Sequence, residues 1–285
     1  ARGGFDEDEL CQQIGQMDAL LIRSATKVTR KAIEAAGDRL KLIGRAGVGV
    51  DNVDIEAATR HGVWVTNTPG ANAISVAEHT VGLMISVMKK MNLADRMVKD
   101  GEWPAGNLGR CFELNGKVHG QIGFGQIGAN VARMTRNAFN MEVLVYDPYV
   151  SEEVIRDQVS GRKVDLDTLL EEADVVTLNL PSNDETRGLI NYERLRKMKK
   201  TAILINTARG GVVTQEDLVR YLQEGGLYGA GLDVTVDEPI EPGNPLLQME
   251  RVTLTGHTAG STWEFLQRGS RWILEDQRRV SQGEK

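Results

Sequence analysis

The stretch that decides the fold is residues 118–128, which read VHGQIGFGQIG. An expected strand over 118–123 runs into a G-x-G-x-x-G pattern that opens an expected helix. The first glycine of such a pattern permits a tight turn, the second lets the backbone approach a pyrophosphate, and the third lets the helix pack on the strand. N–H groups at the helix N-terminus then hold the phosphates. The pattern predicts a dinucleotide-binding unit with these cofactor-binding residues: Gly123, Gly125, Gln126, Ile127 and Gly128.

The segment downstream contains the acidic residue that such a unit needs. The next expected strand, 142–146, is followed by Asp147, which lies 19 residues after Gly128. At this distance a carboxylate accepts hydrogen bonds from the adenosine ribose hydroxyls. It also repels the additional phosphate of NADP, so the predicted cofactor is NAD. The alternative is that Asp147 only caps a turn before Pro148.

Working outward from this unit, apolar β-branched runs alternate with amphipathic stretches, which is typical of βαβ units and a parallel sheet. The second half of the chain contains six expected strands, at 118–123, 142–146, 175–180, 202–206, 229–234 and 252–255. This number matches a doubly wound Rossmann domain. The first quarter contains three more, at 19–23, 40–45 and 63–67.

The expected helices suggest how the chain divides. A single long helix is expected over 72–100, and Ser261 with Glu264 forms a capping-box pattern that opens a last helix to about residue 282. That helix follows the six-strand set, so we expect it to return to the first domain. The predicted fold is α/β with two doubly wound parallel-sheet domains. They are a smaller, discontinuous, flavodoxin-like substrate domain (1–69 plus 261–285) and a Rossmann NAD-binding domain (70–260).

Composition excludes several classes of protein. The chain has 285 residues, is 41% hydrophobic and carries a formal charge of −6 without a basic stripe, so nucleic acid is not an expected partner. No apolar run has the length of a membrane span. Cys11 and Cys111 stand apart, which favours a reducing cytoplasm and predicts no metal site. The chain opens without Met or a first strand, and we expect an N-terminal segment to be missing from it.

Three residues of the second half have side chains that suit hydride exchange between NADH and a 2-keto acid. One group must anchor the carboxylate, a second must give a proton to the oxygen, and a third must favour the charged form of that donor. Arg209, His257 and Glu238 suit these roles, respectively. Each follows one of three consecutive expected strands, where ligands bind in open α/β sheets. Taken singly, each has a plainer interpretation, as a surface charge, a structural histidine and a loop acid.

One feature does not fit this scheme. His119 and Gln121 place polar side chains in the first Rossmann strand, where apolar residues are usual. The residues themselves suggest no function for them.

Taken together, these motifs resemble those of the D-isomer-specific 2-hydroxyacid dehydrogenase family, from about residue 6 to the end of the chain. The resemblance rests on Gly123–Gly128, Asp147, Asn206–Gly211, Asp237-Glu238-Pro239 and His257–Gly260. Segments 23–29 and 44–54, with Asn67–Gly70 and Ala77–Thr80, most resemble the D-3-phosphoglycerate dehydrogenase branch.

The resemblance implies further roles. Arg209 would bind the substrate carboxylate, and Glu238 would pair with His257, the general acid/base. The other implied cofactor-binding residues are Thr80, Pro181, Thr186, Ala208, Asp233 and Gly260. The other implied substrate-binding residues are Arg23, Ser24, Val48 and Gly49.

The expected function is therefore NAD-dependent interconversion of a D-2-hydroxy acid and its 2-keto acid, with 3-phosphoglycerate as the leading substrate. Two alternatives stay open: a hydroxypyruvate/glyoxylate or broad 2-keto acid reductase, and an NAD-sensing binding protein similar to co-repressors of this architecture. Gly256 stands where the family usually has Pro, which predicts a looser backbone beside His257. The apolar surface of the 72–100 helix predicts a homodimer.

Overall fold

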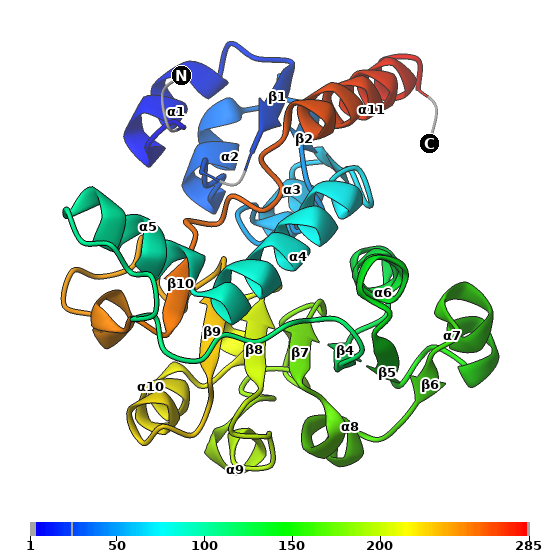
Figure 1. Ribbon diagram of the computed structural model, residues 1–285. Coiled ribbons are helices and arrows are strands. Elements are labelled where there is room, and N and C mark those ends of the chain that lie inside the picture. Colours follow the sequence, from blue (N-terminus) through cyan, green and yellow to red (C-terminus); the bar gives the residue numbers. More distant parts are fainter. Residues whose placement is uncertain (1–3, 24, 284–285) are drawn as a thin grey trace. The chain divides into compact units, whose positions relative to one another are not determined.

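The structure, a computed structural model, describes residues 4–23 and 25–283 and divides into two compact units. Unit 1 comprises the residues up to Asn72 together with those from Gly260 onward, and unit 2 comprises Ala73–Ala259. Both units place helices against a parallel sheet (Figure 1). The predicted α/β class with parallel sheets is confirmed.

Unit 1 is built on a three-stranded parallel sheet in the order β1-β2-β3. Helices α1–α3 and the sheet enclose one apolar core, and α11 packs on β2 and β3. Gly44 on β2 makes this second contact possible, since a Cβ there would lie 2.5 Å from Ile273 Cγ2 of α11. The elements are α1 Glu7–Ile14, β1 Ala19–Ile22, α2 Arg30–Ala36, β2 Leu42–Arg45, α3 Ile55–Arg60, β3 Trp64–Asn67 and α11 Trp263–Ser281.

Unit 2 is built on a seven-stranded parallel sheet in the order β10-β9-β8-β7-β4-β5-β6. Its strands are β4 Val118–Ile122, β5 Glu142–Tyr146, β6 Arg162–Lys163, β7 Val175–Leu178, β8 Ile203–Asn206, β9 Gly229–Leu232 and β10 Val252–Leu254. Its α-helices are α4 Ala73–Lys89, α5 Met91–Lys99, α6 Gln126–Phe139, α7 Glu152–Val159, α8 Leu166–Glu172, α9 Tyr192–Leu195 and α10 Gln215–Gln223.

Helices cover both faces of the unit 2 sheet. Figure 1 shows α4 and α6 on one face and α8, α9 and α10 on the other. Strands β7 and β8 are buried along their whole length, which explains why residues 175–178 and 203–206 are apolar except for Thr177 and Asn206. Because all seven strands are parallel, their carboxyl ends lie at one edge of the sheet, where their loops are presented together.

The expected single helix over 72–100 is wrong. The chain forms α4 and α5, which are separated at Lys90, whose φ is +51°. The Lys90 ammonium donates to the Leu108 carbonyl at 2.6 Å and lies 5.5 Å from the centre of the Tyr228 ring. These contacts with distant segments stabilise the break, which the helical periodicity of the sequence does not reveal.

Two smaller expectations also need correction. The sheet has a seventh strand, β6, whose two residues are too few to produce a sequence pattern. The last helix is capped by Thr262, whose side chain accepts from Phe265 N at 3.2 Å, and not by Ser261. Ser261 Oγ instead accepts a hydrogen bond from Arg23 at 3.2 Å.

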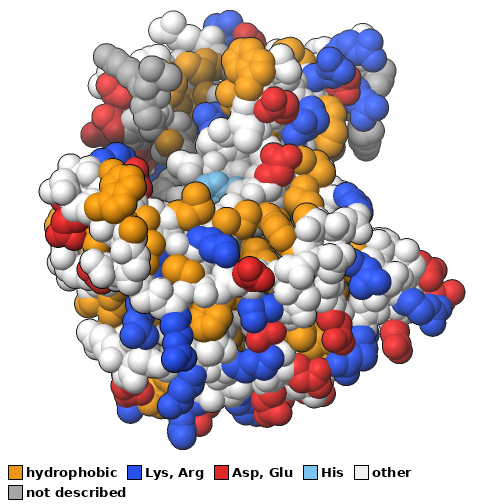
Figure 2. All heavy atoms as spheres, viewed as in Figure 1, with side chains coloured by type: hydrophobic (Ala, Val, Ile, Leu, Met, Phe, Trp, Pro, Cys, Tyr) orange, Lys and Arg blue, Asp and Glu red, His pale blue; other side chains and the backbone are white. Residues whose placement is uncertain are grey.

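The surface of unit 2 seen in Figure 2 intersperses Lys and Arg with Asp and Glu side chains. Within residues 4–23 and 25–283, no helix combines the length and apolar character needed to cross a membrane. Over the same residues, no three His, Cys, Asp or Glu side chains are grouped as metal ligands would be.

Candidate active site

The three residues proposed for the chemistry lie in unit 2, beyond the ends of adjacent strands. Arg209 follows β8, Glu238 follows β9 and His257 follows β10, and the sheet order places these strands side by side. The fold therefore brings together residues that are up to 48 positions apart in the sequence.

His257 and Glu238 form a direct pair. The imidazole Nδ1 lies 2.6 Å from Glu238 Oε2, and both side chains are partly exposed, by 37% and 38%. Burial of the Glu238 carboxyl raises its pKa, but the hydrogen bond and charge of His257 outweigh this effect and leave the pKa below its ordinary value. Glu238 is therefore a carboxylate at neutral pH and an acceptor for the ring N–H. Nε2 remains the ring nitrogen that can exchange a proton with a substrate oxygen.

Arg209 is held by the backbone around it. Asn206 accepts from Ala208 N at 3.0 Å and donates to the Arg209 carbonyl at 2.9 Å. Gly210 allows this loop to pack on the loop after β9, because a Cβ there would lie 2.0 Å from the Thr235 carbonyl oxygen. The charge of Arg209 contributes to lowering the pKa of Glu238. A fixed guanidinium beside the His257–Glu238 pair is suited to binding a carboxylate.

The loop that carries His257 is organised by the buried carboxylate of Asp233. It accepts from Thr255 Oγ1 at 2.7 Å, from Thr258 N at 2.9 Å and from Ala259 N at 3.1 Å. The backbone N–H of His257 donates to the Asp233 carbonyl at 2.7 Å. The backbone on both sides of Gly256 is thus hydrogen-bonded, and His257 is held at a φ of +55°.

The glycine-rich loop fits a dinucleotide. Gly123 has a φ of +86°, and a Cβ there would lie 2.5 Å from the Asn179 carbonyl oxygen. A Cβ at Gly128 would lie 2.1 Å from the Gly123 carbonyl oxygen, so the turn and the helix can meet only without side chains. A Cβ at Gly125 would meet open space. Gly125 occupies the N-cap position of α6 and offers no side chain to the first-turn N–H groups. Such N–H groups are suited to donate to a phosphate.

Asp147 caps a turn, which is the structural role that the sequence allowed as the alternative to ribose binding. Its Oδ1 accepts from Tyr149 N at 2.8 Å and Val150 N at 3.2 Å, which caps the turn after β5. Its Oδ2 accepts from Phe124 N at 2.7 Å, which also ties it to the glycine-rich loop. Since a carboxylate has about four acceptor sites, the three bonds leave about one site for a ribose hydroxyl.

The other cofactor candidates of unit 2 lie in the loop after β7, in the loop after β8 and on α4. Thr186 Oγ1 donates to the Pro181 carbonyl at 2.7 Å, in the loop after β7. Thr80 Oγ1 on α4 lies 2.8 Å from Thr207 Oγ1, and Thr207 precedes the buried Ala208.

The substrate candidates of unit 1 lie at the carboxyl ends of its own strands. Arg23 follows β1, while Val48 and Gly49 follow β2, next to Gly47, whose N–H donates to Thr68 Oγ1 at 2.8 Å. Ser24 lies outside the described residues. The last cofactor candidate, Gly260, also belongs to unit 1.

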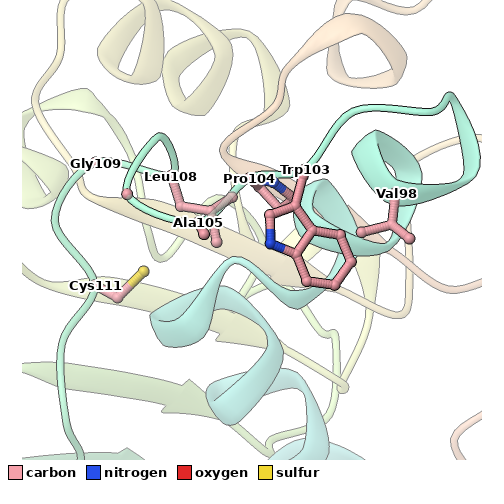
Figure 3. A pocket seen from close by; sticks show the side chains of 8 residues that line it. Val98, Trp103, Pro104, Ala105, Leu108, Gly109 and Cys111 are labelled. Carbon is pink, nitrogen blue, oxygen red and sulfur yellow. The ribbon is translucent and has the colours of Figure 1, made fainter.

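One pocket of unit 2 involves none of these residues. It has a volume of about 460 Å³ and lies in the segment after α5 (Figure 3). It is lined by Val98, Trp103, Pro104, Ala105, Gly106, Leu108, Gly109 and Cys111. This lining is almost entirely apolar and contains no acid, base or phosphate-binding loop.

Two supporting residues received no role from the sequence. Asn206 holds the Arg209 loop, and the sequence marks it as a polar residue at the end of an apolar strand. His79 on α4 places Nε2 2.9 Å from Thr255 Oγ1 and 3.5 Å from Asp233 Oδ1, behind the His257 loop. The sequence marks it as a polar residue within the apolar stretch of α4.

The chain matches a family profile described as the NAD-binding domain of the D-isomer specific 2-hydroxyacid dehydrogenases, over residues 81–259. It is 44% identical over 273 residues to a D-3-phosphoglycerate dehydrogenase of Archaeoglobus fulgidus. The aligned region covers 96% of this chain but only 51% of that protein. It is 43% identical to a hydroxypyruvate reductase of Thermotoga maritima, with 93% of this chain and 85% of that protein covered.

A solved structure gives a similar result. The D-lactate dehydrogenase of Aquifex aeolicus, complexed with NAD and lactic acid, superimposes with a TM-score of 0.84 at 31% identity. The match covers 96% of this chain and 85% of that one.

Proposed function

Because the chain belongs to the D-isomer specific 2-hydroxyacid dehydrogenase family, we propose that it interconverts a D-2-hydroxy acid and its 2-keto acid with NAD(H). The observation that carries this proposal is the set formed by Arg209, Glu238 and His257 at the ends of three adjacent strands. The retained acid/base pair favours an enzyme over a sensor that only binds NAD.

Each residue of this set has one task in the proposed reaction. Arg209 binds the substrate carboxylate through its planar guanidinium, which turns the carbonyl toward His257. His257 donates the proton on Nε2 to the carbonyl oxygen during reduction and takes it back during oxidation. Glu238 accepts the N–H on Nδ1 and favours the charged ring. Bound nicotinamide would supply or accept the hydride.

The glycine-rich loop and α6 are proposed to hold the pyrophosphate, with Asp147 binding the ribose hydroxyls. We also propose that Thr80, Ala208 and Asp233 contact the nicotinamide and that Pro181 and Thr186 lie beside the adenosine. Gly260 is proposed to complete the cofactor-binding set.

For the substrate, we propose 3-phosphoglycerate, with 3-phosphohydroxypyruvate as the keto acid. The 44% identity to a D-3-phosphoglycerate dehydrogenase supports this choice. Arg23 is the residue proposed to bind the phosphate, Val48 and Gly49 to bind the carboxylate through backbone N–H groups, and Ser24 to assist them. Unit 1 would then be the substrate domain and unit 2 the NAD-binding domain.

A hydroxypyruvate or glyoxylate reductase is the second candidate, favoured by the 43% identity to a hydroxypyruvate reductase. A panel of 2-keto acids with NADH, followed by the loss of NADH absorbance, separates the two. Phosphohydroxypyruvate should have the highest kcat/KM. A higher kcat/KM for hydroxypyruvate or glyoxylate would favour the second candidate, and no turnover with bound NADH would favour a sensor.

We further propose that the protein is a cytoplasmic homodimer that associates through α5 and the segment after it. Helix α5 has no buried residue, and Met91, Val98 and Trp103 are 54%, 47% and 78% exposed. So much apolar surface in one place favours burial against a second copy. Light scattering should give twice the chain mass, and Trp103→Glu should lower it towards the monomer mass. An unchanged dimer in that variant would place the interface elsewhere.

A further inference from the structure

The first strand of the unit 2 sheet carries two fully buried polar side chains. His119 and Gln121 on β4 are both 0% exposed, between the neighbouring strands β5 and β7. Buried polar groups are destabilising unless they are hydrogen-bonded. Their partners therefore indicate why an otherwise apolar position holds them.

His119 lies at one end of a chain of side-chain hydrogen bonds. Its Nδ1 is 2.9 Å from Thr135 Oγ1 and its Nε2 is 2.8 Å from Thr177 Oγ1. Thr177 Oγ1 donates to Gln121 Oε1 at 2.8 Å, so it can only accept from His119. The ring proton therefore sits on Nε2. Burial lowers the pKa of His119 to about 3, which keeps the ring neutral.

Gln121 continues the chain and uses its whole amide. Its oxygen accepts from Thr177, while its Nε2 donates to the Gly123 carbonyl at 2.9 Å and to Asn179 Oδ1 at 3.1 Å. The Gly123 carbonyl is the group that faces the third glycine of the loop, Gly128. One amide group thus fixes the position of the turn that opens α6.

The chain then passes to the next loops of the sheet. Asn179 Nδ2 donates to Thr207 Oγ1 at 2.9 Å, and Thr207 Oγ1 lies 2.8 Å from Thr80 Oγ1. Because Thr80 donates to the Val76 carbonyl at 2.7 Å, Thr207 must donate to Thr80. From His119 to Thr80 the donors of this chain all point in the same direction. A buried network of hydrogen-bonded side chains is rigid and specifies one arrangement of its members.

This network connects the loops in which the cofactor candidates lie. Gln121 holds the glycine-rich loop after β4, Asn179 lies in the loop after β7 that continues to Pro181, and Thr207 begins the loop after β8 that contains Arg209. An apolar side chain at 121 could fill the same space in the sheet, but it could not hold these loops at a fixed spacing.

We propose that Gln121 is a positioning residue for the dinucleotide, which holds the pyrophosphate loop through the Gly123 carbonyl and couples it through Asn179 and Thr207 to the nicotinamide side of the site. This inference rests on the proposed NAD-dependent function. His119 acts differently, because it supports the buried end of the network and contacts none of these loops.

The test measures the Kd of NADH and of ADP-ribose, which lacks nicotinamide, by calorimetry well below the melting temperature of each variant. Gln121→Met keeps the length of the side chain but leaves the Gly123 carbonyl without its donor. It should weaken both ligands about five- to thirtyfold, as expected for a lost buried hydrogen bond. Asn179→Ala keeps the bond to Gly123 and cuts the link to Thr207, so it should weaken NADH but not ADP-ribose.

His119→Leu is the matched control. It removes two buried hydrogen bonds at the far end of the network and should lower Tm while leaving both Kd values within about twofold of wild type. The inference is overturned if Gln121→Met binds NADH as tightly as wild type. It is also overturned if affinity falls in proportion to Tm in all three variants, since that is the result of a merely structural role.

If Gln121→Met does not fold, the NADH and ADP-ribose affinities of Asn179→Ala test the inference. This variant should fold, because Asn179 is only partly buried and lies in a loop. Equal losses of NADH and ADP-ribose affinity in that variant would contradict the coupling to the nicotinamide side. A wild-type chain that binds neither ligand would instead overturn the proposed function, and this inference with it.

Discussion

Replacing Glu238 by Gln removes the charge beside His257 with little change in shape. The two side chains are joined by a contact of 2.6 Å. A hydrogen bond between charged groups stabilises by about 1.5–3 kcal/mol, and partial exposure to water reduces this to about 1 kcal/mol. Since about 1.36 kcal/mol corresponds to a tenfold change in an equilibrium constant, the interaction that the variant loses corresponds to a factor of about five.

The sign of the effect follows from the direction of the reaction. Reduction of a keto acid needs the protonated imidazole, so its rate falls as the pH rises. In Glu238→Gln the imidazole loses its charged partner, so the descending limb of kcat/KM for reduction should move to lower pH. Oxidation needs the neutral ring, and its ascending limb should move in the same direction.

The assay is the pH profile of kcat/KM in both directions, measured for wild type, Glu238→Gln and the control Asp237→Asn. Asp237 is adjacent in sequence and contributes its backbone carbonyl to Thr235, so its neutral variant should keep the wild-type profile. An unmoved limb in Glu238→Gln, with a shifted one in Asp237→Asn, would refute the pairing. His257→Ala should lower kcat by roughly 10²–10⁴-fold, and near-full activity there would remove His257 from the mechanism.

The same pair has a consequence for stability. The pKa of Glu238 in the folded protein lies below its ordinary value of 4.5. Its contribution to the free energy of unfolding is therefore fully present above pH 4.5 and is lost as the pH falls through the lowered value. Urea unfolding of Glu238→Gln should lack this component of the acid dependence.

Three further predictions concern other residues. The carboxylate of Asp147 should make kcat/KM with NADH higher than with NADPH by a factor that corresponds to about 1–3 kcal/mol; equal values would remove Asp147 from cofactor selection. Arg23→Ala should raise KM for phosphohydroxypyruvate much more than for hydroxypyruvate, whereas a uniform rise would indicate a folding defect. The folded pKa of His119, about 3, lies below its ordinary value of 6.5, so the unfolded chain binds the additional proton between these values and stability should fall as the pH drops through that window. His119→Leu should show a flatter dependence in urea unfolding, and an unchanged slope would mean that other groups cause it.

The sequence by itself determined the α/β class, the glycine-rich turn and the strands that position the triad. These features are local. Gly123 and Gly128 stand where only glycine fits, and largely apolar runs such as 175–178 and 203–206 have the pattern of buried parallel strands whatever their partners are. The triad could be selected because Arg209, Glu238 and His257 each follow such a run.

Only the tertiary structure decided features that depend on contacts between distant segments. The break at Lys90 is stabilised by its contacts with Leu108 and Tyr228. The cap of α11 falls on Thr262, while Ser261 accepts from Arg23. The buried network that begins at His119 is the clearest case. Its donors and acceptors lie on β4, β7, α4 and α6 and in the loops after β7 and β8, up to 127 positions apart between Thr80 and Thr207. A polar residue in a strand is destabilising when its partners are unknown, and only the folded sheet supplies the partners that make it favourable.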